Sequence, residues 1–311
     1  MYINTAFCFD HNLVRQVQVA AASLLDHRGS AQTHYHIYCV CTKEAAAVEE
    51  ALRQIVAARD PASELTMRVA DNPYADSYQV RGISAGTYLR LELHRLLPEV
   101  DKILYTDVDI LFQGSLRELW ETPLEGKFLA AVRGGANLAD QWARNSERPY
   151  WHHLEKVRGN YINAGVTLMN LALIRERQME KQWREWAKEK LYYQDQDILN
   201  ITCQGAIAFL PFRYNSLAYM TDVDYDNCIR EGIYSAQECE EGRKCPVIIH
   251  YAGDKPWKRY DTNRGNLWWD YVKSQPDLAG LFDEAAARSC HGPTVMQRAL
   301  RKLRRLLGLE K

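Results

Sequence analysis

Two aspartates interrupt the stretch from Lys102 to Phe112, which is otherwise mostly apolar and rich in β-branched and aromatic residues. Such a run predicts a buried strand, and a buried strand does not tolerate two unpaired carboxylates. In regular extended structure Asp107 and Asp109 would point to the same side. A hard divalent cation with a phosphate partner would compensate their charge. The alternative is a pair of strand-end aspartates that caps the following turn.

The composition is that of an ordinary globular protein, and 311 residues can bury a substantial core. A formal net charge of -1 argues against a globally basic nucleic-acid-binding protein. No run approaches the roughly 18 apolar residues that cross a bilayer, and the N-terminus does not resemble a signal peptide. We therefore expect a cytoplasmic protein. Its eight cysteines form no Cys-x-x-Cys pair, so we expect reduced thiols.

Strand and helix patterns alternate along the first part of the chain. The expected elements are strands at 2–9, 36–41 and 65–69 and helices at 13–25 and 44–58. Alternation at this spacing indicates parallel βαβ units, whose ligands bind at the carboxyl ends of the strands. Asp10 follows the first strand and Asp107 a later one, so both are expected at that edge of the sheet.

Residues 84–97 carry leucines at helical spacing, with Arg90 close to the apolar face. This arginine either extends its charge to solvent along the edge of the face or reaches an acid or phosphate. Ser115 stands three residues before Glu118, which predicts a capping box for a short helix.

Further strands are expected at 128–132 and 161–170, and a long helix at 175–190. Asn163 stands among small residues that let a ligand approach the backbone. Asp195 begins another helix, so its carboxylate lies near a positive helix end. In the segment 246–257 an apolar strand pattern ends in His250, which is the candidate third metal ligand.

Residues 213–244 are expected to form a loop. Its acidic part, from Asp222 to Asn227, superficially resembles a calcium loop. Asn227 occupies the sixth position in place of glycine, and Ile233 the twelfth in place of glutamate. A solvated acidic loop is the better interpretation.

The C-terminal residues 295–311 predict a basic amphipathic helix that associates with an anionic membrane surface. The alternative is a helix packed on the domain with a solvated basic side. The apolar face and the basic residues are Met296, Leu300, Leu303 and Leu307, and Arg298, Arg301, Lys302, Arg304 and Arg305.

Four blocks, taken in order, resemble glycosyltransferase family 8, and specifically its bacterial lipopolysaccharide galactosyl- and glucosyltransferases. The blocks span residues 104–109, 163–166, 193–200 and 250–257. The resemblance runs from residue 2 to about residue 270. It implies a Rossmann-like GT-A fold with a mixed, mostly parallel sheet, a catalytic domain over 1–270 and a C-terminal helical region over 271–311. An Asp-x-Asp pair alone is unspecific, because Asp195/Asp197 and Asp222/Asp224 repeat it.

The same resemblance implies a role for individual residues of this sequence. Mn²⁺ or Mg²⁺ would be held by Asp107, Asp109 and His250. The UDP-sugar donor would contact Cys8, Asp10, Asn12, Arg90, Asp107, Val108, Asn163, Ala164, Gly253 and Lys255, and Gln196 and Asp195 would be catalytic. Two positions depart from the family pattern: Arg133 follows the 128–132 strand, where an aspartate is frequent, and Leu13 follows Asn12, where an aromatic is frequent.

The implied activity is retaining transfer of galactose or glucose from a UDP-sugar to a lipopolysaccharide or other glycan acceptor. Because an amide is a poor nucleophile, we expect Gln196 to stabilise an oxocarbenium-like transition state rather than form a covalent intermediate. Two other interpretations are a self-glucosylating initiator similar to glycogenin and a non-catalytic nucleotide-sugar-binding protein.

Overall fold

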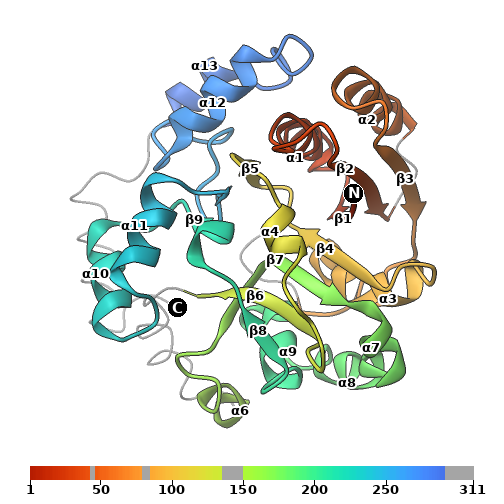
Figure 1. Cartoon of the computed structure of the whole chain (residues 1–311), viewed down its shortest axis with the longest axis vertical. Coiled ribbons are helices and arrows are strands. Elements are labelled where there is room, and N and C mark those ends of the chain that lie inside the picture. The colour runs from red at the N-terminus through yellow and green to blue at the C-terminus, as the bar shows by residue number, and fades with distance from the viewer. Residues whose placement is uncertain (43–45, 79–84, 135–149, 291–311) are drawn as a thin grey trace. The chain divides into compact units, whose positions relative to one another are not determined.

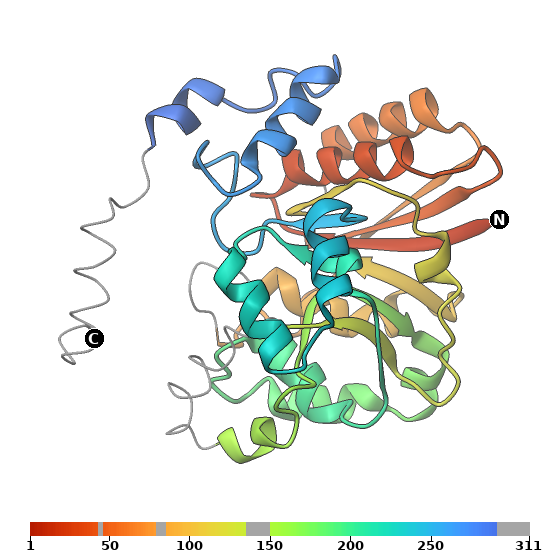
Figure 2. The same ribbon diagram turned by 60° about the vertical axis from the view of Figure 1, so that its left-hand side comes forward.

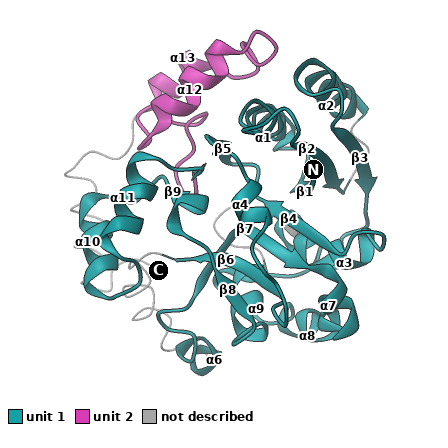
Figure 3. Cartoon of the chain, in the orientation of Figure 1, with its two compact units in different colours: residues 1–250 teal, residues 251–311 magenta. Residues whose placement is uncertain are grey.

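The computed structural model describes residues 1–42, 46–78, 85–134 and 150–290. The chain forms two compact units, residues 1–250 and 251–311 (Figure 3). This structural division falls after His250, whereas the end of the catalytic domain was expected at residue 270. That functional boundary stays a prediction.

The first unit is built on a seven-stranded sheet in the order β3-β2-β1-β4-β7-β6-β8 (Figure 1). Its strands are β1 (Tyr2–Phe9), β2 (His34–Cys41), β3 (Glu64–Val69), β4 (Lys102–Thr106), β6 (Leu129–Arg133), β7 (Ile162–Asn170) and β8 (Ile207–Phe209). Only β7 runs against its neighbours, and every other pairing in this sheet is parallel. The predicted mixed, mostly parallel sheet is therefore confirmed.

Helices cover both faces of this sheet (Figure 2). One face carries α1 (Val14–Asp26) and α2 (Ala46–Arg59), and the other carries α3 (Leu93–Leu96), α7 (Leu171–Glu176), α8 (Met179–Trp186) and α9 (Gln194–Thr202). The second face holds a core in which Tyr105, Trp183 and Leu199 are buried. This burial of apolar side chains is the main driving force that fixes the helices on the sheet.

Three helix predictions need correction. The helix expected at 84–97 starts as a 3₁₀ helix, η1 (Ala85–Glu92), before α3. The helix expected at 175–190 is split, because Gln178 adopts a left-handed φ of 51° between α7 and α8. No capping box forms at Ser115: α4 (Arg117–Trp120) begins after Leu116 without a side-chain cap, and the Ser115 hydroxyl accepts a hydrogen bond from the Arg117 amide.

The acidic run at 102–112 is also not one strand. It divides into β4 and β5 (Ile110–Phe112), and β5 belongs to a second sheet with β9 (Ser216–Leu217) and β10 (Ile248–His250). The expectation that a single strand directs both carboxylates to one side was wrong. The chain leaves the large sheet at Asp107 and enters the small one after Asp109, so neither carboxylate is placed inside a continuous strand.

The region expected to be a loop at 213–244 is largely helical, with η2 (Phe212–Asn215), α10 (Asp222–Arg230) and α11 (Ala236–Lys244). Capping boxes explain why. The Thr221 amide donates to the Asp224 carboxylate at 2.8 Å, and the Ser235 amide donates to Glu238 at 2.9 Å. Side-chain caps of this kind satisfy backbone donors that a helix start leaves unpaired. The acidic residues from Asp222 onward therefore begin a helix rather than a solvated loop.

The second unit holds α12 (Gly265–Ser274) and α13 (Glu284–Ser289), and Trp257, Trp268 and Phe282 pack ring against ring within it. The remaining described helix is α6 (Trp151–Glu155) in the first unit. The basic amphipathic helix predicted at the C-terminus lies outside the described residues. In the described part of the chain, no helix has the length and apolar character needed to cross a membrane. All eight cysteines lie in the described residues, and none of them forms a disulfide bond.

Candidate functional site

The break between β4 and β5 brings Asp107 and Asp109 to the second sheet. His250 ends β10 and pairs with Ile110 in the antiparallel β5–β10 register, so it lies beside Asp109. The Asp107 amide donates to the Gly165 carbonyl at 2.8 Å, which holds this corner against β7. Two strand ends that are far apart in the sequence thus meet, as the interpretation of a shared site requires.

The three side chains form a compact group of oxygen and nitrogen ligands. His250 Nε2 lies 3.3 Å from Asp109 Oδ1 and 3.6 Å from Asp107 Oδ2. One ligand atom from each residue lies within 4.8 Å of the others. Ligands about 2.1 Å from Mg²⁺ lie about 3 to 4 Å apart, so this spacing fits a single divalent cation. Two carboxylates and one imidazole suit Mn²⁺ or Mg²⁺.

Arg90 connects this group to the neighbouring helix. Its guanidinium donates to Asp107 Oδ1 at 2.9 Å, pairs with Asp195 Oδ2 at 2.7 Å and donates to the Ala164 carbonyl. It also lies over the Tyr105 ring, 4.3 Å from its centroid. The side chain is 4% exposed, so the alternative in which Arg90 extends to solvent was wrong, and the alternative in which it reaches an acid is confirmed.

The charge states in this group follow from burial and pairing. Burial lowers the pKa of Arg90, but the carboxylates of Asp107 and Asp195 raise its pKa overall, so the guanidinium stays charged. Burial raises the pKa of Asp195 to about 6, and the charge of Arg90 opposes part of that rise. At neutral pH Asp195 is therefore mainly ionised and paired. Burial also raises the pKa of Tyr105, so its hydroxyl stays protonated and donates to Asp107 Oδ1 at 2.6 Å.

Gln196 is held in one orientation by hydrogen bonds to β7 and to Tyr161. Its Oε1 accepts from the Ala164 amide at 3.0 Å, and its Nε2 donates to the Tyr161 hydroxyl at 3.0 Å. Tyr161 in turn donates to Asp197 Oδ1 at 2.6 Å. Because a backbone N–H only donates, the carbonyl oxygen of Gln196 must face Ala164. Ala164 and Tyr161 thus fix the direction of the side-chain dipole of Gln196, the candidate catalytic amide.

The residues expected at the uridine lie at the end of β1. Phe7 pairs with Thr106 in the parallel β1–β4 register, so both strands end at the same edge of the sheet, as predicted for Asp10 and Asp107. Asp10 Oδ1 accepts from the Asn12 amide at 2.8 Å, which closes the turn after β1. Cys8 is buried beside the charges of Arg90 and Asp107, and burial raises the pKa of its thiol.

Three further residues predicted to contact the donor are Val108, Gly253 and Lys255. Val108 is buried between the two aspartates. Gly253 has a left-handed φ of 98°, and Lys255 Nζ donates to the Tyr251 carbonyl at 2.7 Å. Gly253 and Lys255 belong to the second unit, so their part in the site stays a prediction.

One residue that bears directly on this site was missed by the sequence interpretation. Asn215 is fully buried and its Oδ1 lies 2.9 Å from His250 Nδ1. Its segment was interpreted as an unpatterned loop. An amide directly before a two-residue strand carries little signal in a single sequence, and only the pairing of β9 with β10 brings it beside His250.

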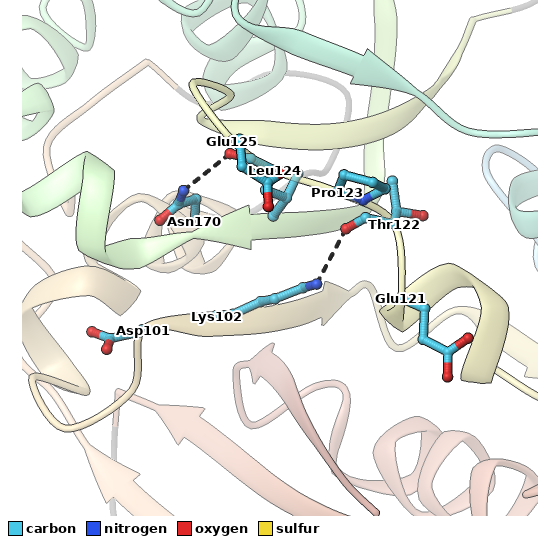
Figure 4. Close-up of a pocket in the computed structure, with 8 residues that line it drawn as sticks. All are labelled: Asp101, Lys102, Glu121, Thr122, Pro123, Leu124, Glu125 and Asn170. Atoms are coloured by element: carbon cyan, nitrogen blue, oxygen red, sulfur yellow. Dashed lines mark hydrogen bonds between the residues drawn. The ribbon is translucent and has the colours of Figure 1, made fainter.

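A hollow of about 380 Å³ lies at the opposite end of β4 (Figure 4). Three of its polar side chains make contacts within the fold. Lys102 Nζ donates to the carbonyls of Trp120 and Thr122, and Asn170 Nδ2 donates to the Leu124 carbonyl. Asp101 pairs with Arg175 at 2.6 Å.

A mostly parallel sheet joined to a small second sheet across an Asp-x-Asp segment is the architecture of the GT-A class of glycosyltransferases. Residues 4–261 match the family model described as Glycosyl transferase family 8. The chain belongs to this family, as its four sequence blocks indicated.

Proteins similar to this chain are glycosyltransferases by their descriptions. A putative glycosyltransferase from Haemophilus influenzae is 32% identical over 219 residues, covering 63% of this chain and 61% of that protein. A lipopolysaccharide 1,2-glucosyltransferase from Escherichia coli K12 is 25% identical over 189 residues, covering 57% and 50%. The match thus spans less than two thirds of each relative. The crystal structure of galactosyltransferase LgtC with donor and acceptor sugar analogs has a TM-score of 0.70 at 24% identity, covering 88% of this chain and 96% of that one.

Proposed function

We propose that this chain is a metal-dependent, retaining hexosyltransferase that moves galactose or glucose from a UDP-sugar to a lipopolysaccharide or other glycan acceptor. The observation that carries the proposal is the meeting of Asp107, Asp109 and His250 beside the Arg90–Asp195 ion pair. These groups combine a site for a divalent cation with fixed charges and dipoles nearby, which a reaction that separates a sugar from a diphosphate needs.

Asp107, Asp109 and His250 would hold Mn²⁺ or Mg²⁺. The cation would supply positive charge to the diphosphate leaving group. Arg90 keeps the Asp107 carboxylate in place through its hydrogen bond to Oδ1, which leaves Oδ2 facing His250. Tyr105 donates to the same Oδ1, so both contacts hold Oδ2 toward the cation site.

Gln196 and Asp195 would act on the sugar side. The fixed amide of Gln196 presents an oriented dipole where positive charge develops at the anomeric carbon, and it needs no reorganisation in the transition state. Asp195 is positioned by Arg90, and its charge adds to this stabilisation. Same-face transfer is proposed, with the leaving phosphate accepting the proton of the acceptor hydroxyl.

The experiment is a donor screen that measures UDP release from UDP-galactose, UDP-glucose and UDP-N-acetylglucosamine with Mn²⁺. Turnover of one donor, its loss with EDTA and its loss in Asp107→Asn are expected. Asp222→Asn is the matched control, because Asp222 belongs to another Asp-x-Asp pair and is exposed on α10. Turnover that survives EDTA would overturn the metal dependence, and no UDP release from any donor would overturn the activity.

Intact-mass spectrometry of the same reactions separates transfer from self-glucosylation. A constant protein mass during turnover is expected, whereas hexose additions to the chain would favour the self-glucosylating alternative.

For the C-terminal residues we propose peripheral binding to an anionic membrane. Deleting residues 293–311 should then reduce binding to anionic vesicles and spare UDP-sugar hydrolysis. Unchanged vesicle binding would contradict it.

A further inference from the structure

A chain of hydrogen bonds runs from the backbone of β7 to the histidine of the candidate metal site. The Gly165 amide donates to Asn163 Oδ1 at 3.0 Å, and Asn215 Nδ2 donates to the same oxygen at 2.8 Å. Asn215 Oδ1 then lies 2.9 Å from His250 Nδ1. Asn215 is 0% and His250 2% exposed, so water does not replace the contact between these two side chains.

The Gly165 amide determines which atom donates and which accepts in each hydrogen bond of this series. A peptide N–H can only donate, so the Asn163 atom that faces Gly165 must be the oxygen. The Asn215 atom facing that oxygen must then be the amide nitrogen, which turns Asn215 Oδ1 toward His250. An amide oxygen only accepts, so His250 Nδ1 must carry the proton.

This assignment leaves the His250 Nε2 lone pair directed at the two carboxylates. Nε2 lies 3.3 Å from Asp109 Oδ1 and 3.6 Å from Asp107 Oδ2, which are also acceptors. Three acceptors that face one another repel unless a cation lies between them. The hydrogen bonds from Gly165 to His250 therefore leave three acceptor groups facing the position that a cation would occupy.

We infer that Asn215 is a positioning residue that holds His250 in the Nδ1–H tautomer. Asn163, whose oxygen is oriented by the Gly165 amide, in turn orients the side-chain amide of Asn215. This inference rests on the metal site of the proposed function. It also limits what Asn163 offers a donor sugar. The two lone pairs of Asn163 Oδ1 accept from the Gly165 amide and from Asn215 Nδ2. Only the Nδ2 group of Asn163 therefore remains to donate to a sugar hydroxyl.

The first test reads the tautomer of His250 in the metal-free wild-type protein. Two-bond proton–nitrogen correlation spectra of protein labelled with ¹⁵N-histidine distinguish a protonated Nδ1 from a protonated Nε2. The signals of His250 are identified by their absence in His250→Asn. The same spectra distinguish a neutral ring from an imidazolium, so the tautomer is read from the neutral ring alone. In the neutral ring, protonated Nδ1 with unprotonated Nε2 is expected. A neutral ring protonated at Nε2, or a mixture of the two neutral tautomers, would overturn the inference.

The second test compares two variants by Mn²⁺ binding, measured from the electron paramagnetic resonance signal of free Mn²⁺. Asn215→Leu removes the acceptor for Nδ1, so Mn²⁺ affinity should fall about 10- to 100-fold and the tautomers should mix. Asn163→Asp is the matched conservative change, because a carboxylate still accepts from both Gly165 and Asn215. It should bind Mn²⁺ at least as well as the wild type.

Wild-type Mn²⁺ affinity in Asn215→Leu, or weakened affinity in Asn163→Asp, would overturn the inference. If Asn215→Leu does not fold, the wild-type tautomer decides alone. None of these measurements depends on sugar turnover. A chain that binds Mn²⁺ with the expected tautomer but releases no UDP would therefore contradict the proposed activity and leave this inference standing.

Discussion

Gly165 packs against the ring of His250 with no space for a side chain between them. A Cβ at residue 165 would lie 2.8 Å from His250 Nδ1 and 2.9 Å from Asp107 Oδ2. The same residue accepts a hydrogen bond from the Asp107 amide through its carbonyl. This glycine is therefore required where two metal-ligand candidates and a backbone strand converge.

Replacing Gly165 with alanine should displace either the His250 ring or the Asp107 carboxylate. Loss of ligand orientation typically weakens metal binding about 10- to 100-fold, and we expect an effect of that size on Mn²⁺ affinity, with a similar loss of UDP release. Gly114→Ala is the matched control, because its Cβ would meet the Val247 methyl groups at an ordinary 3.6 Å. Equal Mn²⁺ binding by the two variants would contradict this prediction.

Arg90→Leu should destabilise the fold as well as the site. It leaves Asp195 buried without its countercharge, and breaking a buried ion pair in this way costs about 3–5 kcal/mol. Urea unfolding of both proteins at neutral pH measures the loss. Arg90→Lys should recover little of it, because an ammonium does not reproduce the planar contacts with Asp107, Asp195 and the Ala164 carbonyl.

The double variant Arg90→Leu/Asp195→Leu separates the ion pair from general packing. Removing both charges should restore part of the lost stability, because no unpaired carboxylate then remains at position 195. If the double variant is less stable than the sum of the single changes, the pair does not carry the expected energy.

The sequence was sufficient to predict the parallel core and the meeting of Asp107, Asp109 and His250, whose role as metal ligands stays a prediction. Apolar runs such as Tyr2–Phe9 match β1 residue for residue, because a strand buried on both faces needs an almost continuous apolar sequence. The pairing of the Asp-x-Asp segment with a distant histidine followed from the ordered blocks. Neither inference depended on knowing side-chain contacts.

What the sequence did not predict depends on contacts between distant segments. The break at Asp107 is fixed by β5 leaving for the second sheet, and no local signal near residue 107 marks that change. The role of Asn215 depends on β9 pairing with β10. By contrast, the Thr221/Asp224 and Ser235/Glu238 capping boxes are local, and they could have been recognised as starts of α10 and α11.

Glu92 makes the stability of the first unit sensitive to acid. Its carboxylate is fully buried and accepts from Arg95 at 2.6 Å, from Tyr74 at 3.0 Å and from Arg184 at 3.3 Å. Burial alone raises the pKa of Glu92, but these hydrogen bonds and charges lower it below its ordinary 4.5. The unfolded chain therefore binds the proton first as the pH falls.

This order fixes the sign of the pH dependence. The contribution of Glu92 is fully present above pH 4.5 and is lost as the pH falls through its lower, folded pKa. Glu92→Gln should lose about 1.5–3 kcal/mol at neutral pH, the usual contribution of hydrogen bonds to a charged group. Its deficit relative to the wild type should shrink on acidification. Urea midpoints across this pH range measure the difference, with the exposed Glu121→Gln as control. A deficit that grows on acidification would contradict the assignment.

Thr5 lies within β1 with its hydroxyl buried, and that oxygen has no hydrogen-bond partner among the described residues. It pairs with Ile37 in β2 and Leu104 in β4, so its strand neighbours offer only apolar side chains. An unsatisfied buried hydroxyl costs about 1–3 kcal/mol.

Thr5→Val, which replaces the hydroxyl by a methyl group, should raise the free energy of unfolding by about 1 kcal/mol. Thr5→Ser is the control, because it keeps the hydroxyl and removes a methyl group, and it should lower stability by about 0.8 kcal/mol. Urea midpoints at unchanged slope measure both, and a valine variant less stable than the wild type would show that the hydroxyl is satisfied in solution.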